Sequence, residues 1–309
     1  MVGQIARALA VFCVDEVVIF DDGQATTSNH DVEVIQQASY TGYTDPNYFL
    51  AHILAYLETP PYLRKQLFPM HPDLRLAGTL PSLDMPHHLR RTDWCQYREG
   101  IATSQDVTTK TRGNPVKKLK PKVSKGMTRV DTGLHQAVYI PIAAPPQSRL
   151  TVKFRDFDFL NIPSGELTAT AVAPSIPREE AGYYWGYSTR SASSLSTVLT
   201  ECPFDGGYDL TIGTSERGIS LSDLNESRAK AQADPEFRHM MVVFGGVAGL
   251  EVAVKADEQL AQLGVHGPEA LFDHWVNLVP GQGSRTIRTE EAVWLGLMGL
   301  RDLVLKNGL

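Results

Sequence analysis

The segment "NLVPGQGSRTIRTEEAV", residues 277–293, combines residue types that often surround a bound ligand. Gly281 and Gly283 let the backbone approach a ligand closely, and Arg285 and Arg288 add positive charge. The residues from Thr289 onward predict a helix directly after this loop. Such a loop could bind a phosphate, a dinucleotide or a ligand of another kind.

The surroundings of this loop argue against the first two ligands. No lysine follows a glycine in the frame of a phosphate loop, and Thr289 is predicted to cap a helix whose first turn already holds Glu290 and Glu291. A dinucleotide motif would need a glycine where Thr286 stands. It would also need an acidic residue after a further strand, but Asp302 lies inside the last predicted helix.

The third alternative is S-adenosylmethionine, whose adenine and sulfonium cation need no phosphate cradle. Main-chain groups can hold the adenine, and carboxylates are tolerated nearby. A second segment, "VVFGGVAGLE" (Val242–Glu251), would supply the other wall. Either loop alone could be a tight turn that requires positive φ. Two glycine loops that each follow a predicted strand and precede a helix favour ligand binding.

The elements that must position these loops belong to an α/β protein. Nearly continuous apolar strands predict a buried parallel sheet, and short β runs between about Tyr97 and Pro177 predict an inserted small barrel. Residues Asp21–Thr44 read as a long loop. The predicted helices are Gln4–Phe12, Asn47–Glu58, 62–68, 191–201 and Glu290–Leu305. The predicted strands are Glu16–Phe20, Gln136–Ile142, Arg149–Phe154, Gly165–Ala173, Gly207–Thr214, Arg238–Gly246 and Leu271–Val279.

Charge is unevenly distributed in this chain of net charge −6. Eight of the twenty residues in Lys110–Arg129 are Lys or Arg and none is acidic, which indicates either a polyanion contact or a solvated loop. No apolar run is long enough to span a membrane, and the N-terminal segment does not resemble a secretory signal. Cys13, Cys95 and Cys202 lie far apart, which fits a reducing compartment.

Four segments together resemble the SPOUT RNA methyltransferases: "GYYWGYSTRSASSLS", "GYDLTIGTSERG", "VVFGGVAGLE" and "NLVPGQGSRTIRTEEAV". The resemblance is to a eukaryotic and archaeal group whose human member is associated with the spindle. "GQIARALAVFCVDEVVIFDD", "PPYLRKQLFPMHPDLRLAGTLPSLDMPHHLR" and "YREGI" extend it to the first hundred residues. It is weakest across Thr103–Ser164. Relatives begin with a strand before the "GQIARAL" helix, so this chain is expected to lack that strand.

The resemblance implies an α/β fold with a C-terminal trefoil knot and an inserted OB-like β-barrel domain. The expected domains are residues 1–90 and 181–309 for the SPOUT fold and 91–180 for the insertion. It further implies a homodimer that uses S-adenosyl-L-methionine, releases S-adenosyl-L-homocysteine and methylates N3 of uridine in large-subunit rRNA. The expected location is the nucleus or nucleolus, and also the mitotic spindle. A non-catalytic RNA-binding or spindle-associated scaffold that retains the knot is the alternative.

Residue roles follow from the same resemblance. Glu216 is a candidate base, with a structural salt bridge to Arg217 as the alternative, and Arg217 is expected to act in the active site. The predicted cofactor contacts are Gly245, Gly246, Gly249, Asn277, Leu278, Gly281, Gln282, Ile287, Arg288 and Thr289. The predicted RNA contacts are Arg190, Arg285, Arg288, Lys117, Lys118, Lys120 and Lys122. No metal site is expected, and the adjacent His87 and His88 are expected to contact RNA or form a hinge.

Overall fold

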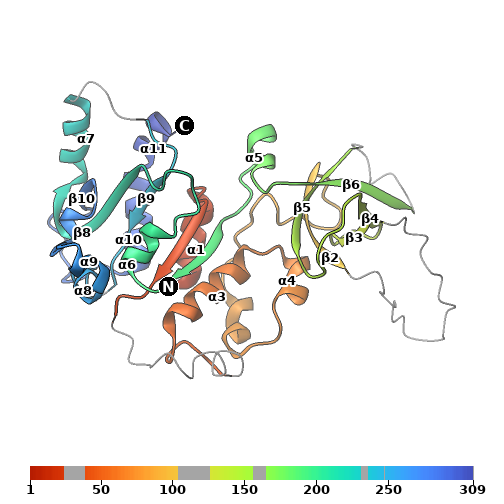
Figure 1. Cartoon of the computed structure of the whole chain (residues 1–309), viewed down its shortest axis with the longest axis horizontal. Helices are drawn as coiled ribbons and strands as arrows, with labels where there is room; N and C mark the ends of the chain where they lie inside the picture. The colour runs from red at the N-terminus through yellow and green to blue at the C-terminus, as the bar shows by residue number, and fades with distance from the viewer. Residues whose placement is uncertain (24–38, 104–125, 156–164, 231–235, 247, 309) are drawn as a thin grey trace. The chain divides into compact units, whose positions relative to one another are not determined.

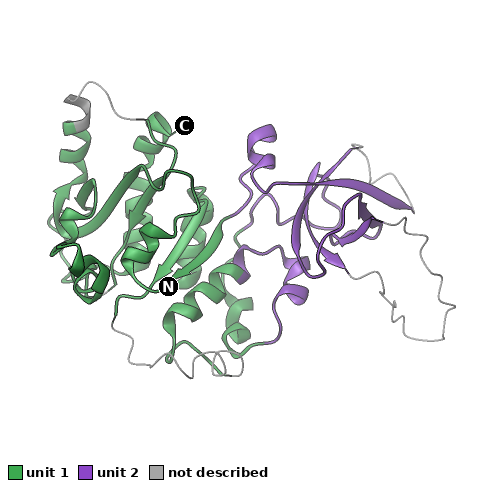
Figure 2. Ribbon diagram, viewed as in Figure 1, with its two compact units in different colours: residues 1–55, 71–83, 187–309 green, residues 56–70, 84–186 purple. Residues whose placement is uncertain are grey.

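The computed structural model describes residues 1–23, 39–103, 126–155, 165–230, 236–246 and 248–308. The chain divides into two compact units (Figure 2). Unit 1 comprises Met1–Ala55, His71–Leu83 and Tyr187–Leu309, and unit 2 comprises Tyr56–Met70 and Asp84–Gly186. Lys117, Lys118, Lys120 and Lys122 lie outside the described residues, so their predicted RNA contacts stay predictions.

Unit 1 contains helices and parallel strands (Figure 1). The amphipathic spacing of α1 buries Val2, Ile5, Ala6 and Leu9 on one face. The helical elements are α1 (Val2–Val11), α3 (Pro46–Glu58, which continues into unit 2), η1 (Pro72–Thr79), α6 (Leu195–Thr200), α7 (Leu221–Lys230), α8 (Leu250–Ala256), α9 (Glu258–Gln262), η3 (Pro268–Ala270), α10 (Thr289–Gly299) and α11 (Arg301–Asn307). The strands are β1 (Glu16–Phe20), β7 (Ser188–Ala192), β8 (Leu210–Ser220), β9 (Met240–Val243) and β10 (His274–Asn277).

Two parallel sheets organise this unit. β1 pairs with β7, and β8 lies between β10 and β9 in a three-stranded sheet. All pairs are parallel, so the carboxyl ends of β8, β9 and β10 point the same way. Ligands of open parallel sheets bind at this edge, and it is where the two glycine loops begin.

Apolar residues on both faces hold the three-stranded sheet in place. One cluster includes Leu195, Val243, Leu250 and Val254, and packs α6 and α8 against the sheet. The other cluster includes Ile212, Val276, Leu224, Leu300 and Leu303, and packs α7, α10 and α11. The sheet is therefore covered on both sides, as its nearly continuous apolar strands predict.

Unit 2 is built around a closed barrel with strand order β2-β3-β4-β6-β5. Its core includes Val130, Val138, Ile140, Val152 and Phe154. β4 and β6 are parallel, and the other neighbours are antiparallel. The elements are β2 (Tyr97–Thr103), β3 (Thr128–Asp131), β4 (Ala137–Ile140), β5 (Arg149–Phe154) and β6 (Glu166–Val172), with α4 (Pro61–Leu67) and α5 (Ile176–Ala181). The predicted β-barrel is confirmed.

Several predicted bounds differ from the structure by a few residues, and three local predictions differ in kind. The helix predicted from residue 191 begins at Leu195, because Ser188–Ala192 forms β7 beside β1. The predicted closing helix is two helices, α10 and α11, which meet at the buried Leu300. The helix cap is Arg288, with Thr289 as the first helical residue. Among the described residues, we find no helix able to cross a lipid bilayer.

Candidate functional site

The segment Thr214–Gly218 bulges from β8 at the carboxyl edge of the sheet. Trp275 of β10 pairs with Gly213, whereas the next residue, Val276, pairs with Ile219. The five intervening residues of β8 therefore have no partner on β10. Gly218 lets the chain rejoin the strand, because an added side chain would collide with the backbone of Trp275 and Val276. The bulge presents Glu216 and Arg217 to solvent.

The side chain of Asn277 joins this bulge to the loop that follows β10. Its Nδ2 donates a hydrogen bond to the carbonyl oxygen of Glu216 at 2.8 Å, and its Oδ1 accepts one from the Val279 N–H at 3.0 Å. One amide group therefore holds the two segments together. The loop continues through Gly281, whose φ of 72° lies in the left-handed region.

The glycines after β9 form a second turn at the same edge. The Gly249 N–H donates to the Gly246 carbonyl at 3.0 Å, and Gly249 has a φ of 78°. A side chain on Gly245 would meet the Leu250 nitrogen at 2.9 Å, so only glycine fits there. The turn leads directly into α8.

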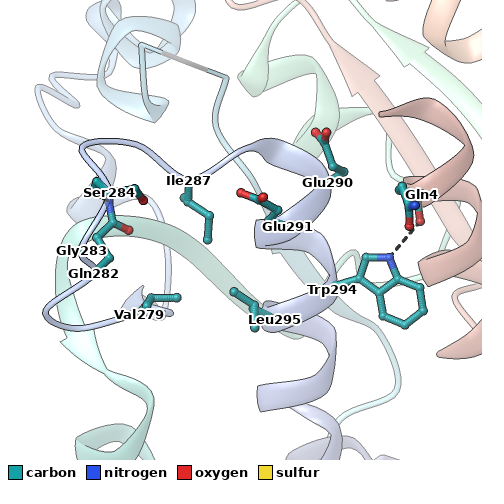
Figure 3. A pocket seen from close by; sticks show the side chains of 10 residues that line it. All are labelled: Gln4, Val279, Gln282, Gly283, Ser284, Ile287, Glu290, Glu291, Trp294 and Leu295. Atoms are coloured by element: carbon teal, nitrogen blue, oxygen red, sulfur yellow. Dashed lines mark hydrogen bonds between the residues drawn. The ribbon is translucent and has the colours of Figure 1, made fainter.

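The loop after β10 lines a cavity of about 700 Å³ together with α10 and α1 (Figure 3). The volume lies within the range of small-molecule sites. In Figure 3, Gln282, Ser284 and Ile287 lie on the loop, facing α10. The Trp294 indole donates to the Gln4 carbonyl at 3.1 Å and joins α10 to α1. The lining residues are Gln4, Val279, Gln282, Gly283, Ser284, Ile287, Glu290, Glu291, Trp294 and Leu295.

The structure brings together only part of the predicted cofactor set in this cavity. Gln282 and Ile287 line it. Asn277, Leu278, Gly281, Arg288 and Thr289 belong to the same segment without being among its lining residues. Gly245, Gly246 and Gly249 do not line it either, and Gly246 lies close to Asp22. The two loops nevertheless approach each other at α10. A side chain on Gly296 would meet the Phe244 ring at 2.8 Å and Leu278 at 3.3 Å.

The contributions of Gln4, Val279, Trp294 and Leu295 to the cavity were not predicted. The sequence could have indicated Trp294 and Leu295, since they follow the glycine loop on the predicted helix. It could not have indicated Gln4, which lies 290 residues from Trp294 in the sequence.

Arg217 forms an ion pair with Glu251 rather than with Glu216, the partner named in the alternative interpretation. Its Nη1 lies 3.4 Å from Glu251 Oε1, in the first turn of α8, and its side chain is 72% exposed. The ion pair joins the β8 bulge to the helix after the second glycine turn. Because the Arg217 side chain is mostly exposed, this pair contributes little to stability.

Hydrogen bonds hold Arg190 within unit 1, and its predicted RNA contact stays a prediction. Its Nε donates to Glu16 at 3.0 Å, and its Nη2 donates to Tyr208 and to the Val198 carbonyl, both at 3.2 Å. These bonds tie β7 to β1 and α6. Burial alone would lower the pKa of the Arg190 guanidinium, but the bonds to Glu16 and Tyr208 outweigh it and raise that pKa. Arg285 and Arg288 are exposed, as an RNA contact requires.

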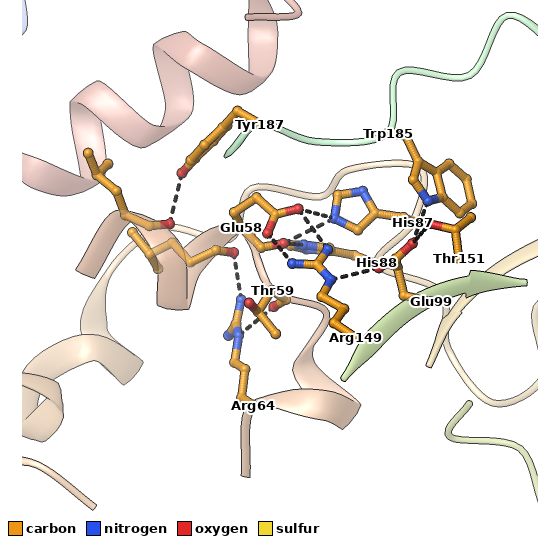
Figure 4. Close-up of polar contacts among 12 residues, drawn as sticks. Glu58, Thr59, Arg64, His87, His88, Glu99, Arg149, Thr151, Trp185 and Tyr187 are labelled. Carbon is orange, nitrogen blue, oxygen red and sulfur yellow. Dashed lines mark hydrogen bonds and ion pairs between the residues drawn. The ribbon is translucent and has the colours of Figure 1, made fainter. Parts of the chain in front are cut away.

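His87 and His88 take part in a buried network in unit 2, so the expected RNA contact is wrong for His87 (Figure 4). Both imidazole Nε2 atoms reach the Glu58 carbonyl, at 3.0 and 2.6 Å, and His87 Nε2 also lies 2.9 Å from the Glu58 carboxylate. Arg149 bridges Glu58 and Glu99, each at 2.6 Å. Burial lowers the pKa of His88 to about 4, which keeps that imidazole neutral.

Comparison with known proteins shows the family to which this chain belongs. Residues 1–300 match the family described as "Putative RNA methyltransferase". The chain belongs to this family. It is 42% identical to the human protein named 28S rRNA (uridine-N(3))-methyltransferase, over all of this chain and 74% of that protein. The mouse protein of the same name is 43% identical, over all of this chain and 72% of that protein.

The Drosophila melanogaster protein with this name is 41% identical over 97% of the chain, which spans only 57% of that relative. Identity above 40% over essentially the whole chain places both units within the family, including the barrel across which the sequence resemblance is weakest.

Proposed function

We propose that this protein is an S-adenosyl-L-methionine-dependent methyltransferase that acts on N3 of uridine in large-subunit rRNA. The family membership is the observation that carries the proposal, since it extends over both units. The arrangement of the site supports it independently. Three parallel strands end at one edge, where two glycine turns meet a bulge that carries an exposed carboxylate, Glu216, and an exposed guanidinium, Arg217.

The residues at this edge suit S-adenosylmethionine better than a phosphate ligand. Gly281 and Gly283 have open space where a Cβ would stand, so a ligand can approach their backbone. The first turn of α10 holds Glu290 and Glu291, and the Arg288 N–H donates to the Glu291 carboxylate at 2.9 Å. These carboxylates disfavour an anion and are compatible with a cationic sulfonium.

The chemistry divides between the cofactor and two side chains of the bulge. The bound cofactor supplies an electrophilic methyl group. Uridine N3 carries its proton at neutral pH, so the enzyme must accept that proton or stabilise the anion left behind. In this proposal Glu216, which is exposed on the bulge, accepts the proton. Arg217 leaves Glu251 and stabilises the negative uracil oxygens or an adjacent phosphate.

We further propose that the barrel is an OB-like RNA-binding domain. Five strands closed in the order β2-β3-β4-β6-β5 support this assignment. OB-folds bind oligonucleotides through the loops that follow their first and fourth strands. In the sequence, the segment between β2 and β3 contains the lysine-rich run, which gives the RNA backbone a source of counter-charge.

A homodimer and the trefoil knot complete the proposal. Exposed apolar side chains on α10 and α11, including Leu295, Met298 and Leu305, support an interface there. The parallel order β10-β8-β9 is compatible with a knotted C-terminal segment. A nuclear or nucleolar location, and association with the spindle, remain part of the same proposal.

Two measurements test the function. Calorimetric titration with S-adenosylhomocysteine should give saturable binding, and an absence of binding would favour a scaffold. Mass spectrometry of rRNA nucleosides should find N3-methyluridine reduced in cells lacking the protein and restored by the wild-type chain. Unchanged N3-methyluridine would overturn the uridine assignment, even if the cofactor bound.

A further inference from the structure

Two histidines and an aspartate meet in unit 1, outside the candidate active site. His52 lies on α3, and His71 and Asp73 lie at the start of η1. Asp73 Oδ2 is 3.2 Å from His52 Nδ1 and 3.2 Å from His71 Nδ1. Potential ligand atoms of all three residues lie within 4.8 Å of one another. The side chains are 11%, 8% and 0% exposed, respectively.

Further contacts hold the aspartate in one orientation. The Thr41 N–H donates to Asp73 Oδ1 at 2.8 Å, and the Thr41 hydroxyl donates to Oδ2 at 2.7 Å. The Tyr48 ring packs against both imidazoles, with ring centroids 5.4 Å from His52 and 6.3 Å from His71. Supporting partners of this kind orient the ligands of metal sites.

Two of the three spacings in this cluster suit tetrahedral coordination. Zinc binds imidazole nitrogen at about 2.0–2.1 Å and carboxylate oxygen at about 2.0–2.2 Å, almost always with tetrahedral geometry in structural sites. Two ligand atoms about 2.1 Å from a tetrahedral ion are about 3.4 Å apart by that geometry. The two 3.2 Å separations from Asp73 Oδ2 are within 0.2 Å of this value.

We propose that His52, His71 and Asp73, with a water molecule as the fourth ligand, form a zinc-binding site that fixes α3 against η1. His71 Nδ1 also accepts a hydrogen bond from the Asp73 N–H at 3.2 Å, and zinc would compete with that bond. The alternative is a purely hydrogen-bonded cluster without metal, in which a proton lies between His52 Nδ1 and Asp73 Oδ2 and His71 Nδ1 keeps its bond from the Asp73 N–H. A zinc site and a metal-free cluster can be distinguished by measuring whether the protein binds zinc.

The test uses the full chain, freed of metal by chelator and titrated with zinc chloride in a calorimeter. One equivalent should bind, and cobalt(II) should give the visible absorption bands of tetrahedral coordination. His52→Gln retains a side chain that can hydrogen-bond Asp73 but removes the imidazole. This variant should weaken zinc binding by more than about 10-fold, the lower end of the effect of losing even a supporting partner.

His266→Ala is the matched control, since it removes an exposed imidazole outside the cluster. It should bind zinc as the wild type does. Zinc should also raise the melting temperature of the wild type and of His266→Ala, but not that of His52→Gln. Equal zinc affinity in His52→Gln, or no binding by a folded wild-type chain, would overturn the proposal. None of these readouts depends on methyl transfer.

Discussion

Gly281 offers a sharp test of the cofactor loop, because its conformation and its surroundings can be separated. Its φ is 72°, and no atom outside the adjacent residues lies within 4 Å of where a Cβ would stand. Gly281→Ala therefore introduces no steric collision. The cost is that of placing an L-residue in the left-handed region, about 1–2 kcal/mol. We expect the free energy of unfolding to fall by about that amount.

Gly264 provides a matched control beyond α9. Its φ is 74°, and it too has open space around the site of a Cβ. Gly264→Ala should therefore cost the same stability in a denaturant titration. Only Gly281→Ala should weaken S-adenosylhomocysteine binding, by at least about 10-fold, which corresponds to 1.4 kcal/mol. Equal affinities of the two variants would refute a role for the Gly281 backbone in binding the cofactor.

Three other predictions follow from the site, the buried network and the apolar surface. Arg217→Ala should lower the single-turnover methylation rate by about 100-fold, as for a lost transition-state donor, while S-adenosylhomocysteine affinity stays unchanged; a normal rate would exclude the role. Burial would raise the pKa of Glu58, but bonds from His87 and Arg149 lower it from 4.5 to about 2. Because the pKa of Glu58 is lower in the folded state, this stabilisation is present above about pH 4.5 and is lost as the pH falls toward 2. Glu58→Gln should lower the free energy of unfolding at neutral pH by on the order of 3 kcal/mol. The free energy of unfolding of this variant should also depend less on pH between about 4.5 and 2. Leu295→Glu should convert the proposed dimer to a monomer in light scattering, whereas Leu263→Glu, also at an exposed leucine, should not.

Regular elements with an apolar pattern could be predicted from the sequence. The strands Glu16–Phe20 and Arg149–Phe154 have the predicted bounds, and the sheet around β8 follows from nearly continuous apolar residues. β2 is different. Its residues Arg98 and Glu99 are buried, although their charges suggest a surface position.

Distant partners explain how β2 can bury these charges. Arg98 donates to the carbonyl groups of Thr132, Asp93 and Arg90, and Glu99 accepts from Trp185 and Thr151. Buried charges are tolerated when they are paired and hydrogen-bonded. Because these partners lie up to 86 residues away, a local pattern could not identify the strand.

The glycines show why the site could be predicted only in part. A glycine is required either because protein atoms crowd it or because a ligand must approach it, and the sequence does not distinguish the two. Gly245, Gly218 and Gly296 are crowded by protein atoms, so packing and chain direction account for them. For Gly245, the tight-turn interpretation is therefore sufficient.

Gly281 and Gly283 are not crowded in this way. Packing does not explain a pair of glycines beside open space, particularly where Gly281 adopts a conformation that other residues disfavour. Gly283 also lines the cavity beside α10. The case for a bound cofactor therefore depends more on the loop after β10 than on the one after β9, and it is strongest where the backbone, rather than any side chain, is available to a ligand.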